Sequence, residues 1–118
     1  MGDLENALPG EILNRGMRSG NELVLSLEDA REAIGVASQN LVAVLGVDVF
    51  RISDTGLWTE TYSGYDFKHD GTWQHFVATN NEAALRFLDE NRFGRGYGYI
   101  LTATSHGEFR KLGEFRKL

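Results

Sequence analysis

The segment of residues 41–65, LVAVLGVDVFRISDTGLWTETYSGY, limits what this chain can fold into more than any other part of it. Almost every residue from 41 to 47 is apolar, a pattern typical of a strand that is covered on both faces. Asp54, Thr55 and Gly56 then supply a tight turn, and residues 57–62 alternate in the manner of a second strand. The segment therefore predicts a hairpin whose first strand is buried.

Two helical patterns precede this hairpin. Residues 8–16, LPGEILNRG, predict a short helix with Pro9 in its first turn and Gly16 at its end. A longer helix begins after Ser26, which can cap it, and Asp29 stands at the capping-box position three residues later. Its expected apolar stripe, spaced at three and four residues, consists of Leu27, Ala30, Ile34, Ala37 and Leu41.

A loop and a third strand are expected after the hairpin. The loop is residues 63–72, SGYDFKHDGT, which is rich in turn formers. Residues 73–78, WQHFVA, are aromatic and β-branched enough to predict a strand. Trp73 and Phe76 are interpreted as structural residues of that strand.

The last predicted elements are a helix and a strand. Thr79 and Glu82 offer a capping box for a helix over residues 80–91, and residues 97–104 predict the final strand. The glycine-rich run GRGYGY between them leaves a helix and enters a strand, which is the reverse of the order in a phosphate-binding loop.

The order helix, helix, three strands, helix, strand predicts an α+β fold. We expect one domain over residues 1–106, with a mainly antiparallel sheet of about four strands and helices packed on one face. Residues 107–118 are a perfect tandem duplication, GEFRKL twice, and are expected to be peripheral, as termini usually are. A slipped duplication, an expression scar and an interaction peptide all remain open as its origin.

Cysteine content, apolar stretches and net charge limit the cellular compartment and the kinds of partner that we expect. The chain contains no cysteine, which excludes a disulfide framework and thiol catalysis. No stretch has the roughly 20 apolar residues of a membrane span, and the N-terminus lacks a signal-peptide pattern, so a soluble, cytoplasmic protein without a membrane partner is expected. The net charge is −5; without the two acids and four bases of the duplication, fifteen acids face eight bases. The acidic excess of residues 1–106 argues against nucleic-acid binding and suits a basic partner.

Candidate catalytic and metal-binding groups are few. His69, Asp70 and His75 do not have the helical spacing of a metal-binding pair, and the available serines lack the context of a nucleophile. We therefore predict no metal, no cofactor and no catalytic residue. Asp48 and Glu60 lie equally far from the hairpin turn and could meet across it as an acid–base pair. The favoured interpretation is that Asp48 bonds to nearby backbone while Glu60 faces water.

The strongest functional signal is an aromatic and acidic surface on the second hairpin strand. By strict alternation Trp58, Glu60 and Tyr62 share one face. If the opposite face packs inward, this surface suits stacking and charge contacts with Arg or Lys of a partner. If not, Trp58 and Tyr62 are themselves core. The predicted contact residues are Trp58, Glu60, Tyr62 and, from the following loop, Tyr65 and Asp66.

Several segments together resemble small α+β immunity proteins of bacterial polymorphic-toxin systems. They are LPGEIL, SGNELVL, SLEDAREAI, LVAVLGVDVF and GYGYIL, and the resemblance spans residues 7–104. It implies a non-enzymatic cytoplasmic protein that neutralises a cognate toxin by binding it directly, and the acidic charge balance suits a basic toxin domain as that partner. The duplicated GEFRKL is no part of that pattern.

Two further expectations concern binding. The alternative function is an accessory domain that binds a small cationic or aromatic ligand. A homodimer is also expected, because an exposed aromatic face and the final strand could each pair with a second copy.

Overall fold

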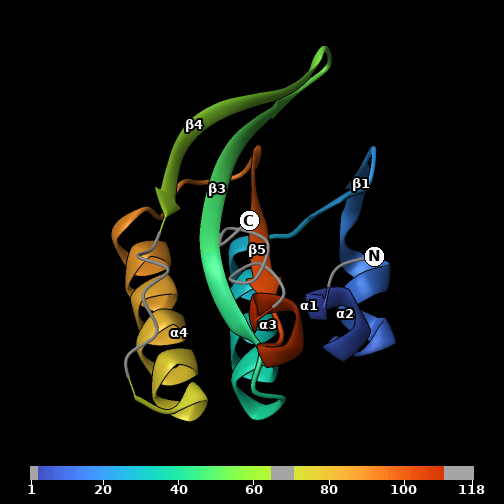
Figure 1. The fold of residues 1–118 in the computed structure, drawn as a ribbon. Helices are drawn as coiled ribbons and strands as arrows, with labels where there is room; N and C mark the ends of the chain where they lie inside the picture. Colours follow the sequence, from blue (N-terminus) through green and yellow to red (C-terminus); the bar gives the residue numbers. More distant parts are fainter. Residues whose placement is uncertain (1–2, 65–70, 111–118) are drawn as a thin grey trace, which may run out of the picture.

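Three antiparallel strands form the main sheet of the computed structural model, which describes residues 3–64 and 71–110. The strands are β3 (Ala43–Ser53), β4 (Gly56–Gly64) and β5 (Tyr97–Thr104), in the order β4-β3-β5 (Figure 1). A second sheet pairs β1 (Met17–Ser19) with β2 (Glu22–Val24). Leu25, directly after β2, exchanges two backbone hydrogen bonds of 2.8 Å with Tyr99 of β5. The two sheets therefore meet at one bridge.

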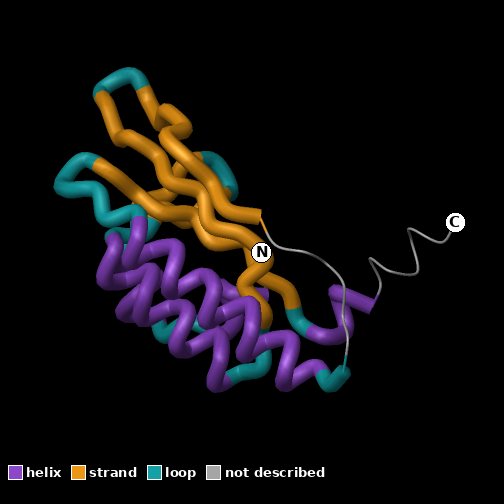
Figure 2. Tube along the Cα trace, turned by 90° about the vertical axis from the view of Figure 1, so that its left-hand side faces the viewer, coloured by secondary structure: helices purple, strands orange, loops and turns teal. Residues whose placement is uncertain are grey.

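The helices of the described residues are α1 (Asp3–Ala7), α2 (Gly10–Arg15), α3 (Leu27–Gln39), α4 (Trp73–Glu90) and a short helix at residues 106–110. The two long helices, α3 and α4, lie together on one side of the strands, and the short helix after β5 is not part of that layer (Figure 2). The predicted α+β fold is confirmed: the chain is a single domain with antiparallel sheets and helices packed on them. Among the helices of the described residues, none combines the length and the apolar character needed to cross a bilayer.

The predicted hairpin is confirmed, and its first strand is covered on both faces. β3 and β4 are joined by the turn at Asp54 and Thr55. Val44, Val47 and Val49 pack in the main core, which also contains residues of α3 and α4. On the other face of β3, Ala43 and Leu45 pack with the start of α4. The following buried residues of the main core surround this strand: Ala30, Ile34, Ala37, Ala84, Leu88 and Tyr99.

A bulge in β4 changes the register that strict alternation predicts. Val49 pairs with Thr61, but the next residue of β3, Phe50, pairs with Thr59. Glu60 is therefore the extra residue, and the pairing of Asp48 shifts to Tyr62. Strand pairing therefore sets Asp48 opposite Tyr62 and not opposite Glu60, so the acid–base alternative considered from the sequence gains no support from the register.

Helix α3 begins where the sequence predicts. The Ser26 Oγ accepts a hydrogen bond of 3.1 Å from the backbone N–H of Asp29, which satisfies one of the free donors of the first turn. Ala30, Ile34 and Ala37 are fully buried. Leu41 does not extend this stripe, because the helix ends at Gln39 and Leu41 is exposed with φ of 55°.

The predicted strand over residues 73–78 is wrong, because this segment is the first part of α4. The N-cap is Thr72, whose Oγ1 accepts from the backbone N–H of His75 at 3.1 Å, and the predicted cap Thr79 lies inside the helix. The buried residues recur at the helical spacing of three and four: Trp73, Phe76, Val77, Asn80, Asn81, Ala84 and Leu88. Trp73 and Phe76 are nevertheless core residues, as expected.

Asn81 joins α4 to the buried start of β3. Its side-chain oxygen accepts from the Val44 N–H at 2.8 Å, and its Nδ2 donates to the Val42 oxygen at 3.0 Å and to the Ser38 Oγ at 2.9 Å. Val44 is paired with Ala103 of β5, whereas the pairing of β3 with β4 begins at Gly46. The buried amide thus supplies hydrogen bonds to β3 at a position that β4 does not reach.

The N-terminal region differs from the single predicted helix. Residues 8–16 contain all of α2, with Pro9 as its N-cap and Gly16 as its C-cap, and the separate helix α1 precedes them. The two-stranded ribbon of β1 and β2 follows α2 and was not predicted from the sequence. Gly16 lies against this ribbon, since a Cβ there would come within 2.4 Å of Leu23 Cδ1.

Candidate functional site

The tip of the β3–β4 hairpin extends beyond the ends of the helices (Figure 1). Trp58 and Ile52 lie on it, and both belong to the few large apolar side chains that are exposed among the described residues. Trp58 is 51% exposed and pairs across the strands with Arg51, while Ile52 pairs with Leu57. The tip therefore presents apolar side chains on a two-stranded projection.

Local hydrogen bonds hold Trp58 in place although it is exposed. Its indole N–H donates to the Ser53 Oγ at 2.9 Å and to the Thr55 Oγ1 at 3.3 Å. The Ser53 Oγ also lies 3.0 Å from the Thr55 Oγ1 and donates to the Gly56 oxygen at 3.1 Å. These contacts connect the ring to the turn itself. The hairpin itself thus fixes the orientation of the indole.

The structure describes only part of the predicted contact surface. Glu60 and Tyr62 belong to β4, but their side chains are outside the described set, and Tyr65 and Asp66 lie outside the described residues altogether. Position 58 pairs with Arg51 and position 62 with Asp48, three residues apart along β3. Since successive strand positions alternate between faces, positions 58 and 62 belong to opposite faces. The premise that they share one face is wrong because of the bulge at Glu60.

Asp48 lies in the middle of β3, between Tyr62 of β4 and Ile100 of β5. It is partly buried, and this burial raises the pKa of its carboxyl above the usual value. Neither of the two residues paired with Asp48, Tyr62 and Ile100, carries a carboxylate. The described residues around Asp48 therefore give no support to the acid–base pair considered from the sequence.

A cavity of about 290 Å³ opens where β2 separates from β5. On one side it is bounded by β2, on the other by β5, and Leu4 of α1 also contributes. Its complete lining is Leu4, Glu5, Asn21, Glu22, Leu23, Leu25, Ile100, Leu101, Thr102 and Ala103.

Strand edges and carboxylates give this cavity polar groups. Leu25 and Tyr99 exchange both backbone hydrogen bonds, so the next such pair in an antiparallel ladder would be Leu23 with Leu101. Within the described part of the chain, no backbone hydrogen bond joins those two residues. Glu5 is also present, ion-paired to Arg18 with a closest distance of 2.8 Å.

Comparisons with protein-family models, curated proteins and solved structures found no match. The candidate sites therefore rest on the geometry described above. The cavity was not predicted, because it arises from the divergence of two strands that are 73 or more positions apart in sequence, and β2 itself was not predicted. The nearest signal in the sequence was the short apolar run LVL at residues 23–25, which is consistent with a strand.

Proposed function

We propose that this chain is a non-enzymatic binding protein that recognises a protein partner through the tip of the β3–β4 hairpin, with Trp58 as the central contact. The observation that carries the proposal is that the Trp58 ring is 51% exposed while its indole N–H is bound to Ser53 and Thr55. Exposed tryptophan is a frequent energetic centre of protein interfaces.

The fixed orientation of Trp58 favours binding. A side chain that is already held by hydrogen bonds loses less conformational freedom when a partner covers it. Exposed Asp54 supplies an acid at the turn, between Ser53 and Thr55, which hold the indole N–H. Ile52, in contrast, pairs with Leu57 and belongs to the opposite face of the hairpin from Trp58. An aromatic ring near a carboxylate suits a partner that contributes Arg or Lys.

The specific partner we propose is a basic bacterial toxin domain, which this chain would neutralise in an immunity-type complex in the cytoplasm. Two observations support this proposal. The chain carries a net charge of −5, which favours encounter with a basic protein. The sequence segments that resemble immunity proteins include the whole of β3 up to Phe50, the strand from which the tip projects.

A binding measurement with the purified product of the neighbouring gene tests this function. If that product is the partner, Trp58→Ala should weaken the complex by about 30-fold or more, as expected for a contact worth about 2 kcal/mol. Leu41→Ala is the matched control, because Leu41 is an exposed leucine at the opposite end of β3 from the hairpin turn. Unchanged affinity in Trp58→Ala, and in Trp58→Ala combined with Glu60→Ala, would refute the proposed surface.

The second candidate function is binding of a small cationic ligand. The cavity between β2 and β5 favours it, since Glu5 and Glu22 contribute to its lining. Its described lining contains no aromatic ring, so charge and backbone groups would provide recognition. A thermal-shift screen with small amines checks this candidate, because a ligand of the folded state raises the melting temperature. The shift should be lost in Glu22→Gln and retained in Trp58→Ala.

A further inference from the structure

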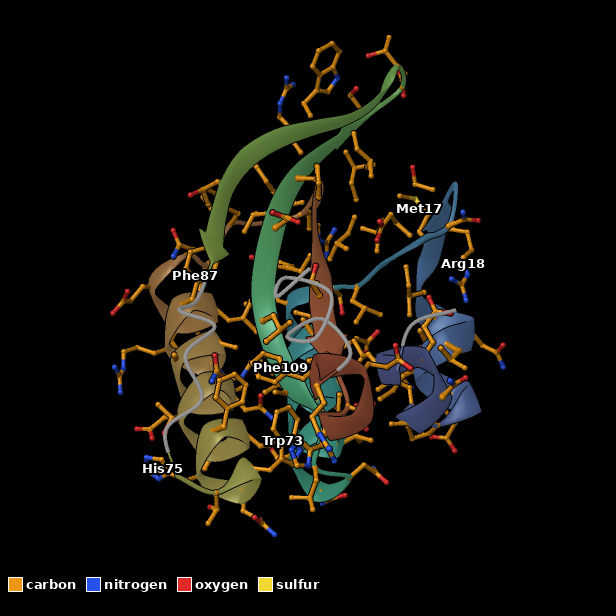
Figure 3. The ribbon with its side chains drawn as sticks, in the orientation of Figure 1. Met17, Arg18, Trp73, His75, Phe87 and Phe109 are labelled. Atoms are coloured by element: carbon orange, nitrogen blue, oxygen red, sulfur yellow. The ribbon has the colours of Figure 1, made fainter. Side chains whose placement is uncertain are left out.

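The short helix at residues 106–110 is attached to the start of α4 by aromatic contacts. The Phe109 ring lies 5.0 Å from the Phe76 ring and 5.6 Å from the Trp73 ring, measured between centroids. Phe109 is partly buried against the cluster that contains both rings. Figure 3 shows Phe109 and Trp73 close together at the front of the molecule. Phe109 thus anchors the end of the described chain to the fold.

Phe109 belongs to the first of the two GEFRKL copies. Residues 107–112 and 113–118 are identical, so Phe115 occupies the same place in the second copy as Phe109 does in the first. The second copy therefore carries the same side chains, in the same order, as the segment that contacts α4.

We propose that the surface formed by Trp73 and Phe76 is a docking site for the GEFRKL motif, and that the second copy is an alternative occupant of it. Phe115 then packs where Phe109 packs in the structure. Because both copies belong to one chain, the exchange is intramolecular and does not depend on protein concentration.

The residues before each copy decide which one is preferred. Ser105 and His106 precede the first copy, whereas Lys111 and Leu112 precede the second. The Ser105 Oγ accepts from the Glu108 N–H at 3.3 Å, which caps the short helix. The His106 ring stacks on Trp73 with centroids 4.7 Å apart and an interplanar angle of 12°. The second copy has neither of these contacts available, so the first copy is the main occupant.

Chain connectivity permits the exchange. β5 ends at Thr104, and the first copy follows after two residues. Docking of the second copy adds six residues to this connection, and the entropy of closing a loop grows only slowly with its length. The penalty is therefore small enough for the second copy to take over when the first is damaged.

Thermal unfolding of the full-length chain and of three variants tests the proposal. Phe115→Ala should leave the melting temperature unchanged, and Phe109→Ala should lower it by no more than about 2 °C, because the second copy replaces the first. The combined variant, Phe109→Ala with Phe115→Ala, should lose about 6 °C or more, because neither copy then has a phenylalanine to pack on Trp73 and Phe76. The proposal is also supported if the combined variant does not fold while Phe109→Ala alone does.

Three results would overturn it. They are a Phe109→Ala variant that is as unstable as the combined variant, a Phe109→Ala variant that does not fold, and a combined variant as stable as the original chain. The role of the preceding residues is tested separately with Lys111→Ser and Leu112→His, which give the second copy the residues of the first. In the Phe109→Ala background these two changes should restore the melting temperature, and a further decrease would contradict the assignment of Ser105 and His106.

Discussion

The two halves of β3 have different surroundings although they form one continuous strand. From Ala43 to Val49 the apolar side chains are buried on both faces, and the Asn81 amide satisfies the backbone at its start. From Phe50 to Ser53 the strand leaves the helices and forms the hairpin tip with Trp58. The difference teaches that stability and recognition are separated along one strand. Substitutions in the first half should affect folding, and those at the tip should affect binding.

The largest effect is expected at the buried end of β3. Asn81→Leu keeps a side chain of similar size but leaves the Val44 N–H and the Val42 oxygen without this partner. The free energy of unfolding should fall by about 2–4 kcal/mol, measured by urea denaturation. Asn80→Ala is the matched control, because the Asn80 amide only donates to the Phe76 oxygen within the same helix, at 2.8 Å. Equal losses in both variants would contradict the role given to Asn81.

A smaller loss is expected at Gly98 of β5, which pairs with Phe50 at the boundary between the two halves of β3. A Cβ at this position would come within 2.2 Å of Val24 Cγ1 and 3.2 Å of Ile52 Cδ1. Gly98→Ala should therefore lower the free energy of unfolding by roughly 1–3 kcal/mol, since neighbouring side chains must shift. Gly94→Ala provides the comparison, because a Cβ there has open space around it. A neutral Gly98→Ala would mean that β2 is less tightly packed on β5 than the structure indicates.

At the tip, Trp58→Ala should alter stability by less than about 1 kcal/mol, because half of the ring is already exposed and its hydrogen bonds are to surface hydroxyls. The same variant should show the large loss of partner affinity described above. Chemical denaturation of the purified variant provides the stability value. A loss of unfolding free energy as large as that of Asn81→Leu would contradict the proposal that the first half of β3 provides stability and the tip provides recognition.

The smallest effect is expected at Asp48, which lies near the boundary between the halves. Burial raises the pKa of its carboxyl, so the folded state binds the proton more tightly than the unfolded state does. The stability due to this group is present below the unfolded pKa, which is about 4, and is lost as the pH rises through the folded value. Asp48→Asn should therefore gain melting temperature relative to the original chain between pH 4 and pH 7. A difference that is constant or decreases over this range would contradict the inference.

The elements predicted well from the sequence are those defined by neighbouring residues. The turn at Asp54 and Thr55 and the cap at Ser26 follow from local hydrogen bonding, and both are confirmed. The start of α4 was missed because aromatic and β-branched residues at 73–78 have strand propensity. Their helical spacing continues through Asn80 and Asn81, whose polar side chains concealed the buried stripe.

The candidate site was predicted only in part for a similar reason. Trp58 is exposed on the hairpin, which is one of the two alternatives that the sequence left open, but the alternation used to group it with Tyr62 fails at the bulge. A bulge depends on how one strand pairs with another, so the composition of β4 does not reveal it. The cavity beside β5 depends in the same way on the direction in which β2 departs.

The amino-acid sequence by itself determined the fold class, the buried first strand of residues 41–65 and the turn that follows it, because apolar patterning and turn chemistry act over short distances along the chain. Only the tertiary structure decided which faces the second strand presents, that residues 73–78 are helical, and that Phe109 packs on α4. These outcomes depend on contacts between residues far apart in the sequence, whose packing and pairing outweigh local propensity.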